Sequence, residues 1–311
     1  MLENPWVLLN KDLCWIASHS YEMIVEFILR NSIFAIRYNK DEPKDEPKSE
    51  LDISCWRNCS TILTQTMLTF ITFPIFIFYP FLMMKSLEVE EIRKPENDTY
   101  CEEKWFFING VMTNTNWLDL NCKYLESRFG RGVTGILNRS YGIVWDLMES
   151  ILHRNFEVDT MSVRWATNRI LPALMDENIK IVRMVSHSQG AIIANLVMKR
   201  LYIELSNTEQ QDYLRKLEVY TFANPSRKFI NPGKLVSRIE HYANDQDPVA
   251  MIGVLSEIGN QHFHGEVFIN NKKGHLFNSF YSLNKEDYKP ATDNTIPTFL
   301  ELPGIVRNLP I

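Results

Sequence analysis

The 311-residue sequence has no concentration of positive charge. Its 33 lysines and arginines are scattered among 38 aspartates and glutamates, and the formal net charge is −5. Proteins that bind nucleic acid usually present a basic stripe or patch to the phosphates. We therefore expect no nucleic-acid partner.

Cysteine is scarce, and its spacing does not suggest a metal site. The cysteines are Cys14, Cys55, Cys59, Cys101 and Cys122. They show no paired spacing with histidines of the kind that builds a zinc site. His262 and His264, which are two positions apart, also lack a carboxylate or cysteine at a spacing that would complete a metal site. The sequence therefore predicts unpaired thiols, no metal and no other cofactor.

The N-terminus lacks the basic segment, apolar block and small-residue cleavage site of a removable signal peptide. A long apolar run does occur further along, where residues 61–84 read TILTQTMLTFITFPIFIFYPFLMM without one charge. This is the length of a bilayer-spanning helix, although Pro74 and Pro80 would kink or interrupt it. We expect membrane association through this transmembrane or monotopic segment. The alternative is a buried helical hairpin.

Residues 1–60 are expected to form an N-terminal helical region and a charged linker. Polar and apolar residues alternate at helical spacing over residues 21–36, which predicts an amphipathic helix. The DEPKDEPKSE stretch, residues 41–50, has too little apolar content to fold and predicts an extended, solvated linker. Basic residues are nearly balanced on the two sides of residues 61–84, so neither orientation nor compartment follows from them.

Residues 99–311 are expected to form the catalytic domain. Short β-rich runs here alternate with helical stretches, which predicts an α/β fold with a mostly parallel sheet covered by helices on both faces. The clearest predicted strands are WFFIN, IVRMV, LEVYTF, RIEHYA and EVFIN. The clearest helix is NWLDLNCKYLESRF, in which Trp117, Leu120, Tyr124 and Leu125 share one face.

The pentapeptide SHSQG, residues 186–190, lies between the apolar strand IVRMV and the helical run AIIANLV. A serine nucleophile at such a strand-to-helix turn needs small residues two positions before and after it. Ser186 and Gly190 meet that requirement around Ser188, although the usual pattern has glycine where Ser186 stands. The alternative interpretation is an ordinary polar turn, so the prediction depends on partner residues.

An activated serine requires an imidazole and a carboxylate that orients the imidazole. His275 lies in the loop after the last predicted strand and is the expected general base. Asp245 and Asp247 both follow RIEHYA, and Asp247, which precedes Pro248, is the favoured acid. The backbone N–H groups of Gln189 and Val111, the latter in a turn made possible by Gly110, are the expected oxyanion hole.

These signals occur in one order along the chain, and residues from about 100 to 311 resemble the α/β-hydrolase superfamily. More narrowly, the motifs NGVMTNTNW, LNRSYGIVWDLMES, HSQGAIIAN, LEVYTFANP and IEHYANDQDPV look like a lipase-like branch of uncharacterised, mainly fungal serine hydrolases. The resemblance implies Ser188 as nucleophile, His275 as general base and then acid, and Asp247 as the orienting carboxylate. It does not extend to residues 1–98. Within LNRSYGIVWDLMES, we expect Tyr141, Trp145 and Asp146 to pack or cap rather than catalyse.

The sequence thus predicts a membrane-anchored serine esterase or lipase that cleaves ester bonds, those of lipids above all, through an acyl-enzyme. One alternative is a catalytically silent, membrane-tethered scaffold with the same fold. Another is a thioesterase or peptidase that uses the same triad. The acyl chain and the oligomeric state cannot be read from the sequence.

Overall fold

The structure is a computed structural model that describes residues 4–19, 50, 56–72, 92–95, 102–140, 143–292 and 295–303. Within these residues, an eight-stranded sheet has the order β1-β3-β2-β4-β5-β6-β7-β8. The strands are β1 (Ile92–Arg93), β2 (Glu103–Ile108), β3 (Val133–Ile136), β4 (Ile181–His187), β5 (Leu217–Phe222), β6 (Arg238–Gln246), β7 (Glu266–Lys273) and β8 (Lys289–Pro290). The inner strands run parallel, whereas β1 and β8 pair antiparallel at the two edges. All five strands predicted from the sequence are confirmed.

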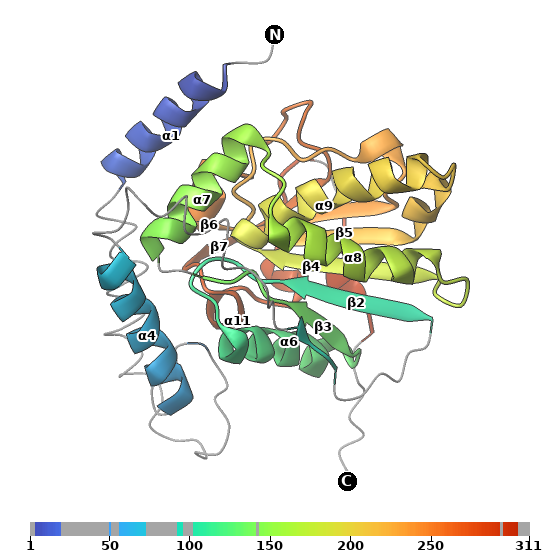
Figure 1. Ribbon diagram of the computed structural model, residues 1–311, viewed down its shortest axis with the longest axis horizontal. Helices are drawn as coiled ribbons and strands as arrows, with labels where there is room; N and C mark the ends of the chain where they lie inside the picture. Colours follow the sequence, from blue (N-terminus) through green and yellow to red (C-terminus); the bar gives the residue numbers. More distant parts are fainter. Residues whose placement is uncertain are drawn as a thin grey trace.

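Helices cover both faces of this sheet (Figure 1). The α-helices of the described residues are α1 (Pro5–Ser18), α4 (Trp56–Thr72), α6 (Thr115–Phe129), α7 (Ile143–Phe156), α8 (Met161–Met175), α9 (Gln189–Ser206), α10 (Pro248–Ile252), α11 (Phe277–Phe280) and α12 (Thr298–Glu301), of which α1 and α4 lie to one side of the sheet. The predicted helix NWLDLNCKYLESRF corresponds to α6. It begins after Asn114, whose side chain accepts from the Trp117 amide, and ends at Gly130 in the left-handed conformation.

The side chains of each buried strand divide between two hydrophobic clusters. In β2, Phe106 and Ile108 pack in the cluster that includes α8 and α9, whereas Trp105 and Phe107 pack in the cluster that includes α6 and α11. Successive side chains of a strand point to opposite faces of the sheet, so an apolar run such as WFFI contributes side chains to both clusters. Figure 1 shows α8 and α9 on one side of the sheet and α6 on the other.

The sheet is mostly parallel with helices on both faces, as the sequence predicts for an α/β fold. From β2 the chain passes through α6 to β3 on one side, then returns to β4 on the other side of β2. In open α/β sheets, such a reversal opens a crevice at the carboxyl ends of the diverging strands, where ligands usually bind. The loop after β2 and the turn after β4 meet at this point.

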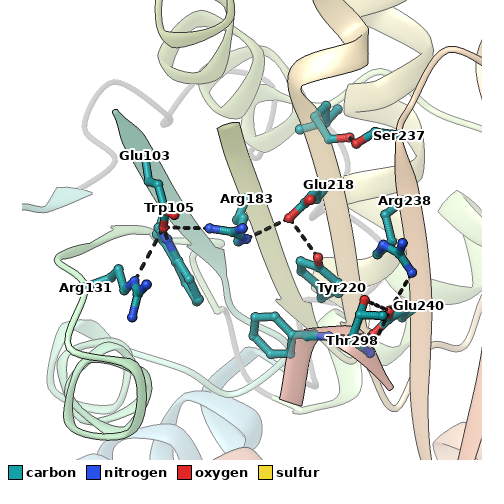
Figure 2. A network of polar contacts seen from close by, with 12 residues as sticks. Glu103, Trp105, Arg131, Arg183, Glu218, Tyr220, Ser237, Arg238, Glu240 and Thr298 are labelled. Carbon is teal, nitrogen blue, oxygen red and sulfur yellow. Dashed lines mark hydrogen bonds and ion pairs between the residues drawn. The ribbon is translucent and has the colours of Figure 1, made fainter. Parts of the chain in front are cut away.

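A network of buried and half-buried charged side chains crosses the strands at a different place (Figure 2). Arg183 of β4 donates to Glu103 of β2 at 2.6 Å and to Glu218 of β5 at 2.7 Å. On β6, the fully buried Glu240 accepts from the backbone amides of Thr298 and Phe299, each at 3.2 Å. Buried charges need such partners, and these contacts attach the segment containing α12 to the sheet.

Helix α1 packs against α7 beside the sheet (Figure 1). Its Asp12 is only 1% exposed. The carboxylate accepts from the guanidinium groups of Arg154 and Arg227 and from the side-chain amide of Asn155. Glu50 differs from the sequence-based expectation. Predicted to end a solvated linker, it is buried instead, and its amide donates to the side chain of Asn278 at 3.0 Å. The rest of that linker and residues 21–36 lie outside the described residues.

Helix α4 contains the first half of the apolar run 61–84, whereas residues 73–84 lie outside the described residues. Asn114 and Asn116, at the start of α6, donate to Thr61 and Asn58 of α4 at 2.9 and 2.8 Å. Among the side chains of α4 whose burial the structure describes, three large apolar ones are exposed: Trp56, Leu63 and Met67. No helix within the described ranges has both the length and the apolar character needed to cross a membrane.

Candidate active site

Ser188 lies on a tight turn between β4 and α9, as the sequence predicts. Its φ of 56° and ψ of −128° place it outside both the helical and the extended regions, a strained conformation of the kind found at functional turns. The turn needs a glycine two residues on, because a Cβ at Gly190 would lie 2.3 Å from the carbonyl oxygen of Ile108. Ser186 is fully buried at the end of β4, so the serine in place of the usual glycine is accommodated.

The structure brings three of the predicted side chains into one hydrogen-bonded chain. Nε2 of His275 lies 2.9 Å from Oγ of Ser188, and Nδ1 of His275 lies 2.9 and 3.0 Å from the two carboxylate oxygens of Asp247. All three residues are at least 95% buried. The alternative acid, Asp245, is half-buried and takes no part in this chain, and its Oδ1 has no hydrogen-bond partner. The geometry therefore selects Asp247.

The carboxylate of Asp247 has two further donors. Its Oδ1 accepts from the amide of Val249 at 2.9 Å, because Asp247 is the N-cap of α10. Its Oδ2 accepts from the hydroxyl of Tyr281 at 2.6 Å. Burial, reinforced by the negative charge of Asp247, raises the pKa of Tyr281 well above its ordinary value, so the phenol remains a donor. Tyr281 carries no local motif, so nothing in the sequence points to this contact.

His187 supports the loop that carries His275. Its Nε2 lies 2.7 Å from the carbonyl oxygen of His275, and the two rings are 4.7 Å apart between centroids. Burial is the main cause that lowers the pKa of His187 well below its ordinary value. The neutral ring donates to that carbonyl. Asn244 donates to the carbonyl of the neighbouring Gly274 at 3.1 Å, which fixes the same loop from the side of β6.

The predicted oxyanion loop follows β2 and lies against the serine. A Cβ at Gly110 would be only 2.6 Å from Cβ of Ser188, so only glycine permits this approach. Val111 is next to it and lines a small cavity with His275. Gln189 directly follows Ser188 as the first residue of α9, and its side chain accepts from Asn138 at 2.7 Å and donates to Glu149 at 3.0 Å.

Asp146 of α7 is hydrogen-bonded to the loop that follows β2. Its Oδ2 accepts from the amide of Met112 at 2.7 Å and from the hydroxyl of Ser140 at 2.5 Å. Met112 has a φ of 59°, which is unusual for a residue with a side chain. Asp146, expected to pack or cap, is buried and holds a loop amide rather than a helix end. Tyr141 lies outside the described residues, and nothing described bears on the side chain of Trp145.

A cavity of about 20 Å³ lies beside the imidazole of His275. Its walls include Val111, Trp117, Leu276 and the carboxyl group of Glu50. Burial raises the pKa of Glu50 to about 7, and hydrogen bonds from neighbouring side chains, such as the Ser279 hydroxyl, only partly oppose this rise. The cavity is therefore small and lined by both apolar and polar side chains, and one of the polar groups is the weakly acidic carboxyl group of Glu50.

No protein-family model and no curated protein matches this chain. Among solved structures, an alpha-beta serine hydrolase homologue from Coxiella burnetii is 15% identical, with a TM-score of 0.34 over 60% of this chain and 83% of that chain. A Pyrobaculum calidifontis esterase is 9% identical, with a TM-score of 0.35 over 70% of this chain and 86% of that chain. Similarity at this level is too low to support an argument about function. The fold assignment rests on the chain's own strand order and on the turn at Ser188.

Proposed function

We propose that the protein is a serine hydrolase that cleaves carboxylic esters through an acyl-enzyme. The observation that carries this proposal is the continuous contact from Ser188 through His275 to Asp247. A serine hydroxyl is a weak nucleophile, and an imidazole within hydrogen-bond reach activates it by accepting its proton. A carboxylate behind the ring fixes its tautomer and stabilises the imidazolium that forms.

In this mechanism the Ser188 oxygen attacks the ester carbonyl while His275 takes the hydroxyl proton. The amides of Gln189 and Val111 donate to the oxyanion of the tetrahedral intermediate. As the intermediate collapses, His275 gives its proton to the leaving alcohol and the acyl group stays on Ser188. A water molecule, deprotonated by His275, then attacks the acyl-enzyme and releases the acid.

The finer assignment, to the lipase-like branch with a lipid ester as substrate and an attachment to membranes, is part of the same proposal. Its support is the uncharged run at residues 61–84 and the exposed Trp56, Leu63 and Met67 of α4. Apolar side chains of this kind bind at the boundary between lipid headgroups and acyl chains. An enzyme held there meets acylglycerols or phospholipids at high local concentration.

The hydrolytic part is tested with the full-length protein and p-nitrophenyl esters of increasing acyl length. Wild-type protein and Ser256→Ala, a control at an exposed serine in the turn after α10, should hydrolyse them alike. Ser188→Ala should lose activity by about 10⁵-fold or more, as is usual when a serine nucleophile is removed. Equal activity in wild type and Ser188→Ala would contradict the proposal.

Membrane attachment is tested separately by flotation of the full-length protein with phosphatidylcholine vesicles. Wild-type protein should float with the vesicles. The triple variant Trp56→Ser, Leu63→Ser and Met67→Ser should remain in the lower fractions, because it lacks the apolar contacts. Wild-type protein that stays at the bottom of the gradient would refute the attachment and leave the hydrolase proposal intact.

A further inference from the structure

Asn109, the first residue after β2, has its side chain buried beside the candidate oxyanion loop. Its Nδ2 donates to the carbonyl oxygens of Gly110 at 2.8 Å and of Asn138 at 2.9 Å. Its Oδ1 accepts from the backbone amide of Asn138 at 2.7 Å. Both donor hydrogens and the acceptor oxygen of the carboxamide are therefore used, which fixes the group in one orientation.

The bond from Asn109 to Gly110 acts on the peptide unit that carries a proposed oxyanion donor. The carbonyl of Gly110 and the amide N–H of Val111 belong to one planar trans peptide, so they point in opposite directions. A hydrogen bond to the oxygen therefore fixes the direction of the N–H and polarises it. This peptide lies beside the nucleophile, because a Cβ at Gly110 would be 3.2 Å from Oγ of Ser188.

The other proposed donor, the backbone amide of Gln189, is fixed in a similar way. Its peptide unit includes the carbonyl of Ser188, which accepts from the amide of Ala191 at 2.8 Å. The side chain of Gln189 accepts in addition from Nδ2 of Asn138 at 2.7 Å. Oδ1 of Asn138 accepts from the hydroxyl of Ser162 at 2.9 Å. Asn138 therefore connects the loop after β2 with the first residue of α9.

These three amide side chains form one buried chain of hydrogen bonds between the two proposed donors. Asn109, Asn138 and Gln189 are 0%, 5% and 1% exposed, and the side-chain nitrogen and oxygen of each are hydrogen-bonded. A fully satisfied polar network in a buried place is rigid. An oxyanion hole is effective when its donors are already in place as the negative charge develops. The network therefore has the property that such a site requires.

We propose that Asn109 is a positioning residue of the oxyanion hole. Its carboxamide orients the peptide between Gly110 and Val111, and Asn138 joins that peptide to Gln189. Asp146 accepts from the next peptide of the loop, through the amide of Met112, so two successive peptides are fixed from different elements. The role of Asn109 rests on the proposed hydrolase function, because it acts only on the donors that stabilise the oxyanion.

The test uses the full-length protein, a p-nitrophenyl ester as substrate and an alkyl trifluoromethyl ketone as inhibitor. The Ser188 oxygen adds to the ketone carbon, His275 takes the hydroxyl proton, and the ketone oxygen becomes an oxyanion that resembles the transition state. Asn109→Ala should lower kcat about 10²-fold with KM within about threefold of wild type. The inhibition constant of the ketone should rise by a similar factor.

Asn195→Ala is the matched control. Asn195 lies in α9, and its side chain also bonds to two backbone groups, the carbonyl of Lys228 and the amide of Ile230, each at 3.1 Å. The variant loses comparable hydrogen bonds away from the oxyanion loop, so its kcat and its inhibition constant should equal those of wild type.

The inhibition constant separates positioning from a loss of folded protein. A variant that folds only in part lowers the measured kcat, but the inhibition constant of the fraction that remains active does not change. Asn138→Ala is a second variant that decides the matter if Asn109→Ala does not fold. It keeps the backbone bonds to Asn109 and loses the bond to Gln189, so the inhibition constant should rise about tenfold.

Two unfavourable results can be told apart. If wild type hydrolyses the ester and the folded variants keep its inhibition constant, the positioning role of Asn109 is overturned and the hydrolase proposal stands. Wild-type protein that neither hydrolyses the ester nor binds the ketone would refute the hydrolase proposal, and the role of Asn109 with it.

Discussion

At the scale of single residues, the structure distinguishes two carboxylates that the sequence places two positions apart. Asp247 is fully buried and contacts both His275 and Tyr281, whereas Asp245 is half-buried and contacts neither. A carboxylate orients an imidazole only from within hydrogen-bond distance. The choice therefore follows from burial and contact, which spacing alone does not provide.

We predict that Asp247→Asn lowers kcat for ester hydrolysis by about 10⁴-fold, because an amide in this position favours the wrong tautomer of the histidine. The matched variant Asp245→Asn should retain kcat within about twofold, since it removes the same charge from a neighbouring residue outside the triad. Steady-state kinetics of the two variants check this. Comparable losses in both would show that local charge, rather than contact with His275, is what matters.

Glu50 gives a prediction about pH and stability. Burial raises its pKa from 4.5 to about 7, so the folded protein holds this proton more tightly than the unfolded chain does. The corresponding stabilisation is complete below about pH 4.5 and is lost as the pH rises through about 7. Over that range, the unfolding free energy of wild type should fall by about 3 kcal/mol relative to Glu50→Gln.

Urea denaturation of wild type and Glu50→Gln at pH 4.5, 6 and 8 measures this difference. Glutamine keeps the size of the side chain and its hydrogen bonds but does not titrate. Parallel pH dependences in the two proteins would mean that Glu50 does not titrate in its buried position.

At the scale of elements, the turn between β4 and α9 depends on its distance from β2. We predict that Gly190→Ala destabilises the protein by about 3 kcal/mol, because the added methyl group would overlap the carbonyl oxygens of Ile108 and Asn109. Gly259→Ala is the matched control, since a Cβ there meets no atom within 4 Å and only the positive φ is strained. It should cost about 1 kcal/mol. Thermal unfolding of both variants checks the difference, and equal losses would contradict it.

The loop after β2 depends on α7 through Asp146. We predict that Asp146→Ala lowers kcat about 10²-fold with little change in KM, because the Met112 amide loses its acceptor and the neighbouring oxyanion donor moves. Asp146→Asn should recover most of this loss, since its amide oxygen can still accept from Met112. A rise in KM alone in Asp146→Ala would show that the contact supports substrate binding instead of catalysis.

The elements and the three side chains of the triad could be predicted from the sequence because each has a local signal. Strand-forming runs, the small residues around Ser188 and the positions of Asp247 and His275 after strands are all visible in short segments. Tyr281, His187 and Glu50 could not be assigned their contacts in this way. Each acts on a residue that lies at least 34 positions away or on another element, and only the folded chain shows the pair.

At the scale of the whole molecule, the two ends of the parallel strands have different roles. The turn at Ser188, the loop after β2 and the loop that carries His275 meet at the carboxyl ends, where Met112 and Ser188 have positive φ and Gly110 and Gly190 allow close approaches. The ion pairs of Glu103, Arg183 and Glu218 lie elsewhere on the same strands and hold them together. A rigid sheet with a strained turn at one end suits a preorganised nucleophile.

The most direct test of the central claim is to treat the folded, full-length protein with a fluorophosphonate and to map the adduct by peptide mass spectrometry. The probe reacts with a serine only when a neighbouring base activates its hydroxyl. We predict one adduct, on the peptide that contains Ser188, and none in Ser188→Ala or His275→Ala. Folded wild-type protein that stays unlabelled, or that carries its adduct on another serine, would contradict the account.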